Sequence, residues 1–179
     1  MPELNSLLGN VDEFVTRLAS GLKQAGLPVT LGEMDHICYR AASKSEYLEK
    51  RDSLARFGLT LVEGMIGGRP IITFSLYAPL PSPFGPIRCI ELAAPKSGRA
   101  HFTGLEHGEI VVPSVAQLLD DYPNVPFNSK GLNAAPPEIS LSLAPYQVKF
   151  HEQSLAKTIA DELANDLVEW VPKDYFDTL

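Results

Sequence analysis

The pattern of apolar and polar positions divides the chain into helical ends and a strand-rich middle. Apolar residues recur at three- and four-residue steps over residues 3–26 and again over 154–167, which is the spacing of one helical face. Gly9 favours a division of the first segment into two helices, and Gly26 ends it. Between these ends, short segments alternate apolar and polar residues, as strands with one buried face do.

The middle of the chain repeats one order of elements. The first half predicts a strand, a helix that begins after the N-cap Ser43, and three further strands, at 33–43, 44–57, 59–66, 70–77 and 87–95. The second half predicts a strand, a helix and two strands, at 104–112, 114–121, 138–144 and 146–153. The Pro- and Asn-rich segment 122–137 is expected to be a loop with room for one more short strand. The sequence therefore predicts an α+β fold made of two similar halves.

Length and composition fit one compact domain. The chain has 179 residues, of which 45% are apolar, enough for a proper core. The expected divisions are an N-terminal helical segment, two modules, and a C-terminal helix with its tail, at 1–30, 31–98, 99–153 and 154–179. The tail is aromatic and acidic, and we expect it to fold back on the body.

Charge and cysteine content narrow the expected partners. A net charge of −7 argues against nucleic acid or an anionic membrane as the main partner. No apolar run approaches the roughly 20 residues that span a bilayer, and the N-terminus lacks the pattern of a signal peptide. Cys38 and Cys89 form no CxxC pair, which favours free thiols in the cytoplasm. We expect a monomer or homodimer that binds a small molecule.

Imidazoles gather on the polar faces of the predicted strands. The expected polar faces include His36, Glu91, His107 and His151, and three of the four histidines of the chain fall on them. His36 and Glu91 come from the first and last strands of one half, and His107 and His151 from those of the other. Such a set suits a divalent Zn, Fe, Ni, Co or Mn ion. A solvated sheet face is the alternative, and periodicity alone leaves both open.

Other polar residues have two interpretations each. Glu109 is either a hydrogen-bond partner of an imidazole or a general base. Glu91 lies among apolar residues, so either a metal ion or Arg40 is expected to compensate its charge. Arg40, Arg69 and Lys149 are candidates for holding an anionic substrate, although a structural role in its turn is equally open for Arg69. His101, in a Gly/Lys/Arg loop, is expected to be solvated.

Four strings carry a resemblance to a known family: MDHICYR, GMIGGRPI, CIELAAPKSGRAHFTGLEHGEIVVP and QVKFHEQSL. Over residues 31–163 the chain resembles the YecM-like family, within the vicinal oxygen chelate superfamily of glyoxalase I and the bleomycin-resistance proteins. The resemblance implies two βαβββ modules that form a cupped, partly closed mixed sheet with helices outside. It also implies metal ligands on the first and last strands of each module, namely His36, Glu91, His107 and His151.

The resemblance supplies no single reaction. One hypothesis is a metal-dependent isomerase, epimerase, lyase or dioxygenase that acts on a small oxygen-rich acid or carbonyl compound, with Glu109 removing a proton. The alternative is a non-catalytic protein that binds or sequesters a small molecule, as the bleomycin-resistance relatives do. His151 stands where glyoxalase I-type enzymes use a carboxylate, which argues against glyoxalase activity itself.

Overall fold

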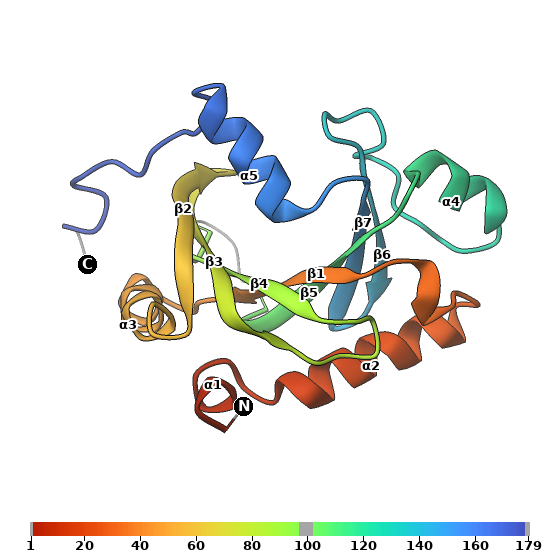
Figure 1. The fold of residues 1–179 in the computed structure, drawn as a ribbon, viewed down its shortest axis with the longest axis horizontal. Helices are drawn as coiled ribbons and strands as arrows, with labels where there is room; N and C mark the ends of the chain where they lie inside the picture. Colours follow the sequence, from red (N-terminus) through yellow and green to blue (C-terminus); the bar gives the residue numbers. More distant parts are fainter. Residues whose placement is uncertain (1, 97–101, 178–179) are drawn as a thin grey trace.

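The computed structural model describes residues 2–96 and 102–177, and its elements follow the predicted order (Figure 1). Three helical elements precede the sheet: α1 (Pro2–Leu8), α2 (Val11–Gln24) and the short 3₁₀ helix η1 (Val29–Leu31). The first module comprises β1 (Met34–Arg40), α3 (Lys44–Leu54), β2 (Gly58–Ile66), β3 (Arg69–Leu80) and β4 (Ile87–Ala93). The second comprises β5 (Gly104–Val111), α4 (Val115–Asp121), β6 (Glu138–Leu143) and β7 (Tyr146–His151), and α5 (Leu155–Ala164) follows.

The strands form one mixed sheet in the order β2-β3-β4-β1-β5-β7-β6. Each module pairs its first strand with its last in parallel, β1 with β4 and β5 with β7. The two modules join through the antiparallel pair of β1 and β5 at the centre of the sheet. In Figure 1 the outer strands rise on either side of this centre, so that the sheet is cupped and open on one side. The predicted α+β class and the cupped mixed sheet are confirmed.

The second module differs from the prediction in its strand number. Among the described residues it has three strands, and the position of a fourth is reduced to the single bridge between Asn128 and Ser140. The segment before β6 contains Pro123, Pro126 and two adjacent prolines, Pro136 and Pro137. Pro126 lies two residues before Asn128, and because proline has no backbone N–H it cannot extend this bridge by donating to β6.

Helix α2 covers the convex, apolar side of the sheet, against β5, β6 and β7. Asn10 caps the helix by accepting a hydrogen bond from the N–H of Glu13, and Leu18 and Leu22 are fully buried. Burying a leucine contributes about 1.5–3 kcal/mol. A Cβ atom at position 108 would lie 3.1 Å from Cδ1 of Leu18, so Gly108 allows the helix to approach β5 closely. This helix therefore supports the strand that carries His107.

Ser43 caps α3, as predicted, by accepting a hydrogen bond of 3.1 Å from the N–H of Glu46. The carboxylate of Glu46 accepts hydrogen bonds from the N–H of Ala42 and the hydroxyl of Tyr39. These bonds tie the start of the helix to the end of β1. The turn between strand and helix is thereby fixed by side chains of both.

Helix α5 lies over the open side of the cup, and residues 165–177, the C-terminal strap, continue past β2 (Figure 1). The N–H of Met65 donates a 2.6 Å hydrogen bond to the carbonyl of Glu169, and Trp170 forms a bridge with Gly64. The ring of Phe176 stacks on Tyr47 of α3 with ring centroids 5.6 Å apart. The expectation that the tail folds back is confirmed. Within residues 2–96 and 102–177, no helix is both long enough and apolar enough to cross a membrane.

Candidate metal centre

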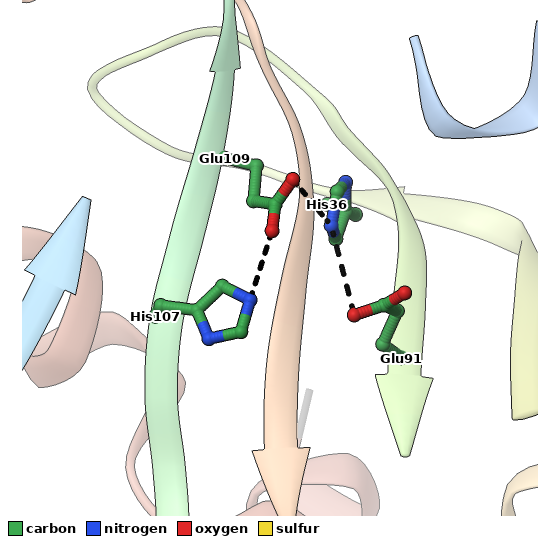
Figure 2. Close-up of side chains that lie close together, drawn as sticks. All are labelled: His36, Glu91, His107 and Glu109. Atoms are coloured by element: carbon green, nitrogen blue, oxygen red, sulfur yellow. Dashed lines mark ion pairs between the residues drawn. The ribbon is translucent and has the colours of Figure 1, made fainter. Parts of the chain in front are cut away.

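Four side chains meet on the concave face of the sheet at the junction of the two modules (Figure 2). They come from three adjacent strands: His36 from β1, Glu91 from β4, and His107 and Glu109 from β5. The strand register explains why these side chains lie close together, because Cys38 of β1 lies opposite both Glu91 and His107. One possible ligand atom of each residue lies within 4.8 Å of those of the others.

The four side chains are almost completely removed from solvent. His36 is 2% exposed and Glu109 4%. Nε2 of His36 lies 3.3 Å from Oε2 of Glu109 and 3.9 Å from Oε2 of Glu91. Nε2 of His107 lies 2.9 Å from Oε1 of Glu109. Two imidazole nitrogens and two carboxylates thus surround one small volume.

Three of the four imidazole nitrogens of this cluster lack hydrogen bonds. Nε2 of His36 and both ring nitrogens of His107 are buried without a partner in hydrogen-bond geometry, although carboxylate oxygens are near. A buried polar atom without a partner costs free energy. Imidazole nitrogens and carboxylate oxygens that converge without forming hydrogen bonds to one another suit a divalent cation. The donor set therefore fits a metal ion.

Asp35 orients the imidazole of His36, and the sequence analysis missed it. Its Oδ1 lies 3.0 Å from Nδ1 of His36, and its Oδ2 accepts a 2.6 Å hydrogen bond from the N–H of Leu155. A carboxylate on one imidazole nitrogen is the usual support for a metal ligand at the other. Strict alternation along the strand would put Asp35 on the face opposite His36, but β1 has an irregular register between Met34 and His36. The adjacent Asp-His pair was the available signal.

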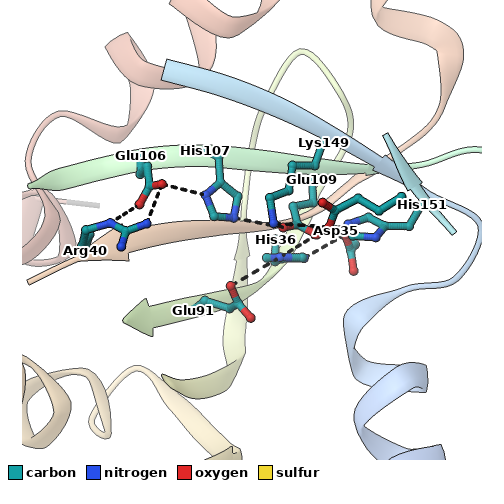
Figure 3. A network of polar contacts seen from close by, with 10 residues as sticks. Asp35, His36, Arg40, Glu91, Glu106, His107, Glu109, Lys149 and His151 are labelled. Carbon is teal, nitrogen blue, oxygen red and sulfur yellow. Dashed lines mark hydrogen bonds and ion pairs between the residues drawn. The ribbon is translucent and has the colours of Figure 1, made fainter. Parts of the chain in front are cut away.

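Glu109 is the centre of a wider charge network (Figure 3). Nζ of Lys149 lies 3.0 Å from its Oε1, and Nε2 of His151 contacts its Oε2. Burial opposes ionisation of Glu109, but the charge of His36 and the close contact with His107 hold the pKa of Glu109 well below the usual value. Burial also opposes charge on His36, yet Glu109 and Asp35 raise the pKa of His36 well above the usual value. In the absence of metal, these shifts favour the charged forms of His36 and Glu109.

The register places Lys149, rather than His151, at the position equivalent to Glu91. Glu91 pairs with Cys38, which lies two positions after His36. In the second module, Lys149 pairs with Glu109, which lies two positions after His107. His151 pairs with Val111, two residues further along the strand. Glu91 and His151 were expected at matching positions because each lies on the last strand of its half. The metal-ligand role of His151 stays a prediction.

Arg40 was one of the two predicted partners for the charge of Glu91, but it does not contact Glu91. Its guanidinium instead makes two hydrogen bonds to Glu106, of 2.5 and 2.7 Å. Burial would raise the pKa of Glu106, but His107 and Arg40 lower it to about 2.

Arg69 begins β3, and its Nε is buried without a hydrogen bond to a described residue. Burial and the charge of Arg40 lower the pKa of Arg69.

A cavity of about 370 Å³ adjoins the cluster. His36, Glu109 and His151 line it on the sheet side, and Leu155 and Glu162 line it from α5. Its volume is in the range of small-molecule sites. Arg40, Arg69 and Lys149, the predicted anion-binding residues, are not among those that line it. Their substrate-binding role stays a prediction, and so does the solvated position of His101, which lies outside the described residues.

Two groups of three residues could also hold a cation, and each shares a member with the cluster. Cys38 and Glu106 form one with His107, and Glu138 and His151 form the other with Glu109. Cys38 and Cys89 are buried free thiols. Burial and nearby carboxylates raise the pKa of Cys38 well above its usual value, so its thiolate is disfavoured. The group of His36, Glu91, His107 and Glu109 is the fullest donor set.

Known proteins resemble the chain over most of its length. Protein YecM of Escherichia coli (strain K12) is 28% identical over 177 residues, which cover 89% of this chain and 94% of that protein. The solved structure named "Structural Genomics, Protein EC4020" has a TM-score of 0.72 and 28% identity, and the match covers 84% of this chain and 87% of that one. A Mn(II) complex of the fosfomycin resistance protein FosX from Listeria monocytogenes has a TM-score of 0.23 at 9% identity, covering 70% of this chain and 95% of that one. This last likeness is too low to carry an argument, and the superfamily assignment stays a prediction.

The family itself is decided by a match to nearly the whole described chain. The family model described as YecM protein matches residues 3–162, which include β1 to β7 and both predicted modules. The predicted resemblance is confirmed at this level: the chain belongs to the YecM protein family.

Proposed function

We propose that the chain is a divalent-metal protein, and more specifically a metalloenzyme that acts on a small oxygen-rich acid or carbonyl compound. His36, Glu91, His107 and Glu109 would hold the ion, and imidazole with carboxylate ligands suits Zn, Fe, Ni, Mn or Co. The observation that carries the proposal is the convergence of buried imidazole nitrogens without hydrogen-bond partners and two carboxylates. The reaction would be of the isomerase, epimerase, lyase or dioxygenase type.

When bound, the ion would act as a Lewis acid toward a ligand that offers two neighbouring oxygens. Glu109 was expected to be the general base, but its low pKa makes it a weak one, and its position suits a ligand. His151 is the better candidate for moving a proton, because it lines the cavity and its side chain is 15% exposed. Its Nε2 contacts Glu109, which would hold the ring in one orientation.

The first test is the metal content of the purified full chain. We would purify it without chelator and measure bound metal by elemental analysis, next to His36→Gln and His107→Gln. We expect about one equivalent in the parent and a loss of most of it in both variants. Glu13→Gln, on the exposed part of α2, is the matched control and should keep its metal.

Two results would contradict the proposal. One is a parent that binds no metal and shows no thermal shift with Zn, Ni, Mn or Fe(II). The other is unchanged metal content in the histidine variants when circular dichroism confirms that they are folded. Either result would favour the second candidate function.

The second candidate is a binding protein without metal chemistry. Its supporting observation is Lys149, which lies 3.0 Å from Glu109 and 3.3 Å from Glu138. With protonated imidazoles, this ammonium group compensates the buried carboxylates in the absence of a cation. A tight metal-free complex with an organic ligand would support this function.

We further infer that the protein works in the cytoplasm on a small molecule, as a monomer or homodimer, without nucleic acid or membrane partners. The net charge of −7 and the free thiols of Cys38 and Cys89 support this inference. Gel filtration with light scattering would measure the oligomeric state.

A further inference from the structure

Helix α5 forms a wall of the cavity beside the proposed metal centre. Leu155, Thr158 and Glu162 line the cavity, and their spacing of three and four residues puts them on one face of the helix. The N–H of Leu155 is bonded to Asp35, the residue that contacts His36. The strap beyond the helix is held at the edge of the sheet by the hydrogen bond between Met65 and Glu169. The helix is thus fixed at both ends over the centre.

The charges around the cavity are distributed unevenly. No lysine or arginine is among the described residues that line it, whereas Glu109, Glu138 and Glu162 all do. Glu109 is compensated by the network around it, and Glu138 pairs with Lys149 at 3.3 Å. The side chain of Glu162 makes no hydrogen bond or ion pair with any residue in the described part of the chain. Glu162 therefore offers an uncompensated carboxylate on the side of the cavity opposite His36 and Glu109.

Apolar groups also line the cavity. Ile66 and Leu155 line the cavity together with Ala134 and Pro136. These side chains would contact a short hydrocarbon segment. The cavity thus combines the candidate metal ligands His36 and Glu109 on the sheet, an apolar lining, and the carboxylate of Glu162 about two helical turns along α5 from Leu155.

We propose that the cavity takes a small chelating compound whose far end carries a protonated amine, with Glu162 as the residue that selects it. This inference rests on the proposed metal function, because the metal would hold the two neighbouring oxygens of the compound. An ammonium group at the far end would form a charge-assisted hydrogen bond with Glu162. A carboxylate at the same place would meet a like charge.

Three hydroxamic acids of similar length test the inference, since each chelates a metal through two neighbouring oxygens. Butanohydroxamic acid has an uncharged end, aminobutanohydroxamic acid has a terminal amine, and succinohydroxamic acid has a terminal carboxylate. We would measure their dissociation constants for the Co(II)-loaded full chain by titration of the Co(II) absorption bands. We expect the amine probe to bind about tenfold more tightly than the uncharged one, and the carboxylate probe more weakly than both.

The variant Glu162→Gln should remove this preference, so that the amine and uncharged probes bind with about equal affinity. Asp166→Asn is the matched control, because it removes one charge just beyond α5, away from the cavity lining. Its backbone φ of 54° is also tolerated by asparagine. This control should keep the preference of the parent.

Four outcomes would overturn the inference. Equal affinities for the amine and uncharged probes in the parent, or tightest binding of the carboxylate probe, would do so while the metal function stands. An amine preference that survives in Glu162→Gln would reject Glu162 as its cause. A parent that takes up no Co(II) would overturn the proposed metal function and this inference with it, and metal analysis before each titration identifies that case.

Discussion

Asp35 lies 3.0 Å from Nδ1 of His36, and through its second oxygen it also holds the first residue of α5. One carboxylate therefore orients a candidate metal ligand and fixes the helix that covers the cavity. The ligand nitrogen Nε2 is directed to Glu91 and Glu109 by this contact. The geometry of the centre and the position of its cover are linked through a single side chain.

Asp35→Asn should weaken metal binding without unfolding the protein. Asparagine keeps an oxygen that can accept the N–H of Leu155, but it loses the charge that supports the imidazole of His36. We expect a loss of about 10–100-fold in metal affinity, measured by competition with a chromophoric chelator. Asp120→Asn, on the exposed side of α4, should bind metal like the parent. Equal affinity in both variants would show that Asp35 does not support the site.

Lys149→Met should strengthen metal binding. The ammonium group lies 3.0 Å from an oxygen of Glu109, so it competes with a cation for that carboxylate. We expect an increase in metal affinity of about tenfold, equivalent to about 1.4 kcal/mol. Lys130→Met, at an exposed position, is the control. Weaker binding in Lys149→Met, in a variant that remains folded, would contradict this prediction and favour the metal-free function.

The stability of the metal-free protein should fall as the pH rises above 6.5. The folded-state pKa values of His36 and His107 are raised above 6.5, so their contribution is complete below 6.5 and is lost as the pH rises through the raised values. In that window, each imidazole lowers the free energy of unfolding by up to about 1.4 kcal/mol per pH unit. Urea unfolding of chelator-treated protein between pH 6 and 9 measures this pH dependence of stability. His36→Gln should show a shallower decline, and an identical slope would exclude His36 as a cause.

Metal binding should show the opposite trend, because the ion requires unprotonated imidazoles. Affinity is expected to rise with pH over the same window, with release of protons on binding. Calorimetry in two buffers of different ionisation enthalpy counts those protons. Binding that is independent of pH between 6 and 9 would be inconsistent with His36 and His107 as ligands.

Glu106→Gln should destabilise the fold with little effect on metal content. It leaves the guanidinium of Arg40, whose side chain is 10% exposed, without its carboxylate partner. We expect a loss of about 3 kcal/mol in the free energy of unfolding at neutral pH. The pKa of Glu106 is lowered to about 2, so its contribution is present above 4.5 and is lost as the pH falls toward 2. Glu49→Gln, which is exposed on α3, should match the parent, and equal stability of the two variants would contradict the prediction.

Local pattern was enough to predict most elements of the fold. Period-two alternation and the capping serine at position 43 identified the strands and α3, because these signals arise from neighbouring residues. The missing fourth strand of the second module could not be predicted in the same way. Whether a short segment completes a ladder depends on the hydrogen-bond donors that it presents to β6, and Pro126 presents none beside the bridge of Asn128.

The sequence predicted the residue types of the candidate site, but it predicted the roles of those residues only in part. The sequence by itself determined that His36, Glu91, His107 and Glu109 lie on polar strand faces, since alternation fixes the side of each residue. Tertiary structure alone decided that Glu109 sits between the two imidazoles, that Asp35 supports His36, and that Lys149 lies opposite Glu109. Those relationships depend on strand register and on an irregularity in β1, which are set by packing between segments far apart in the chain.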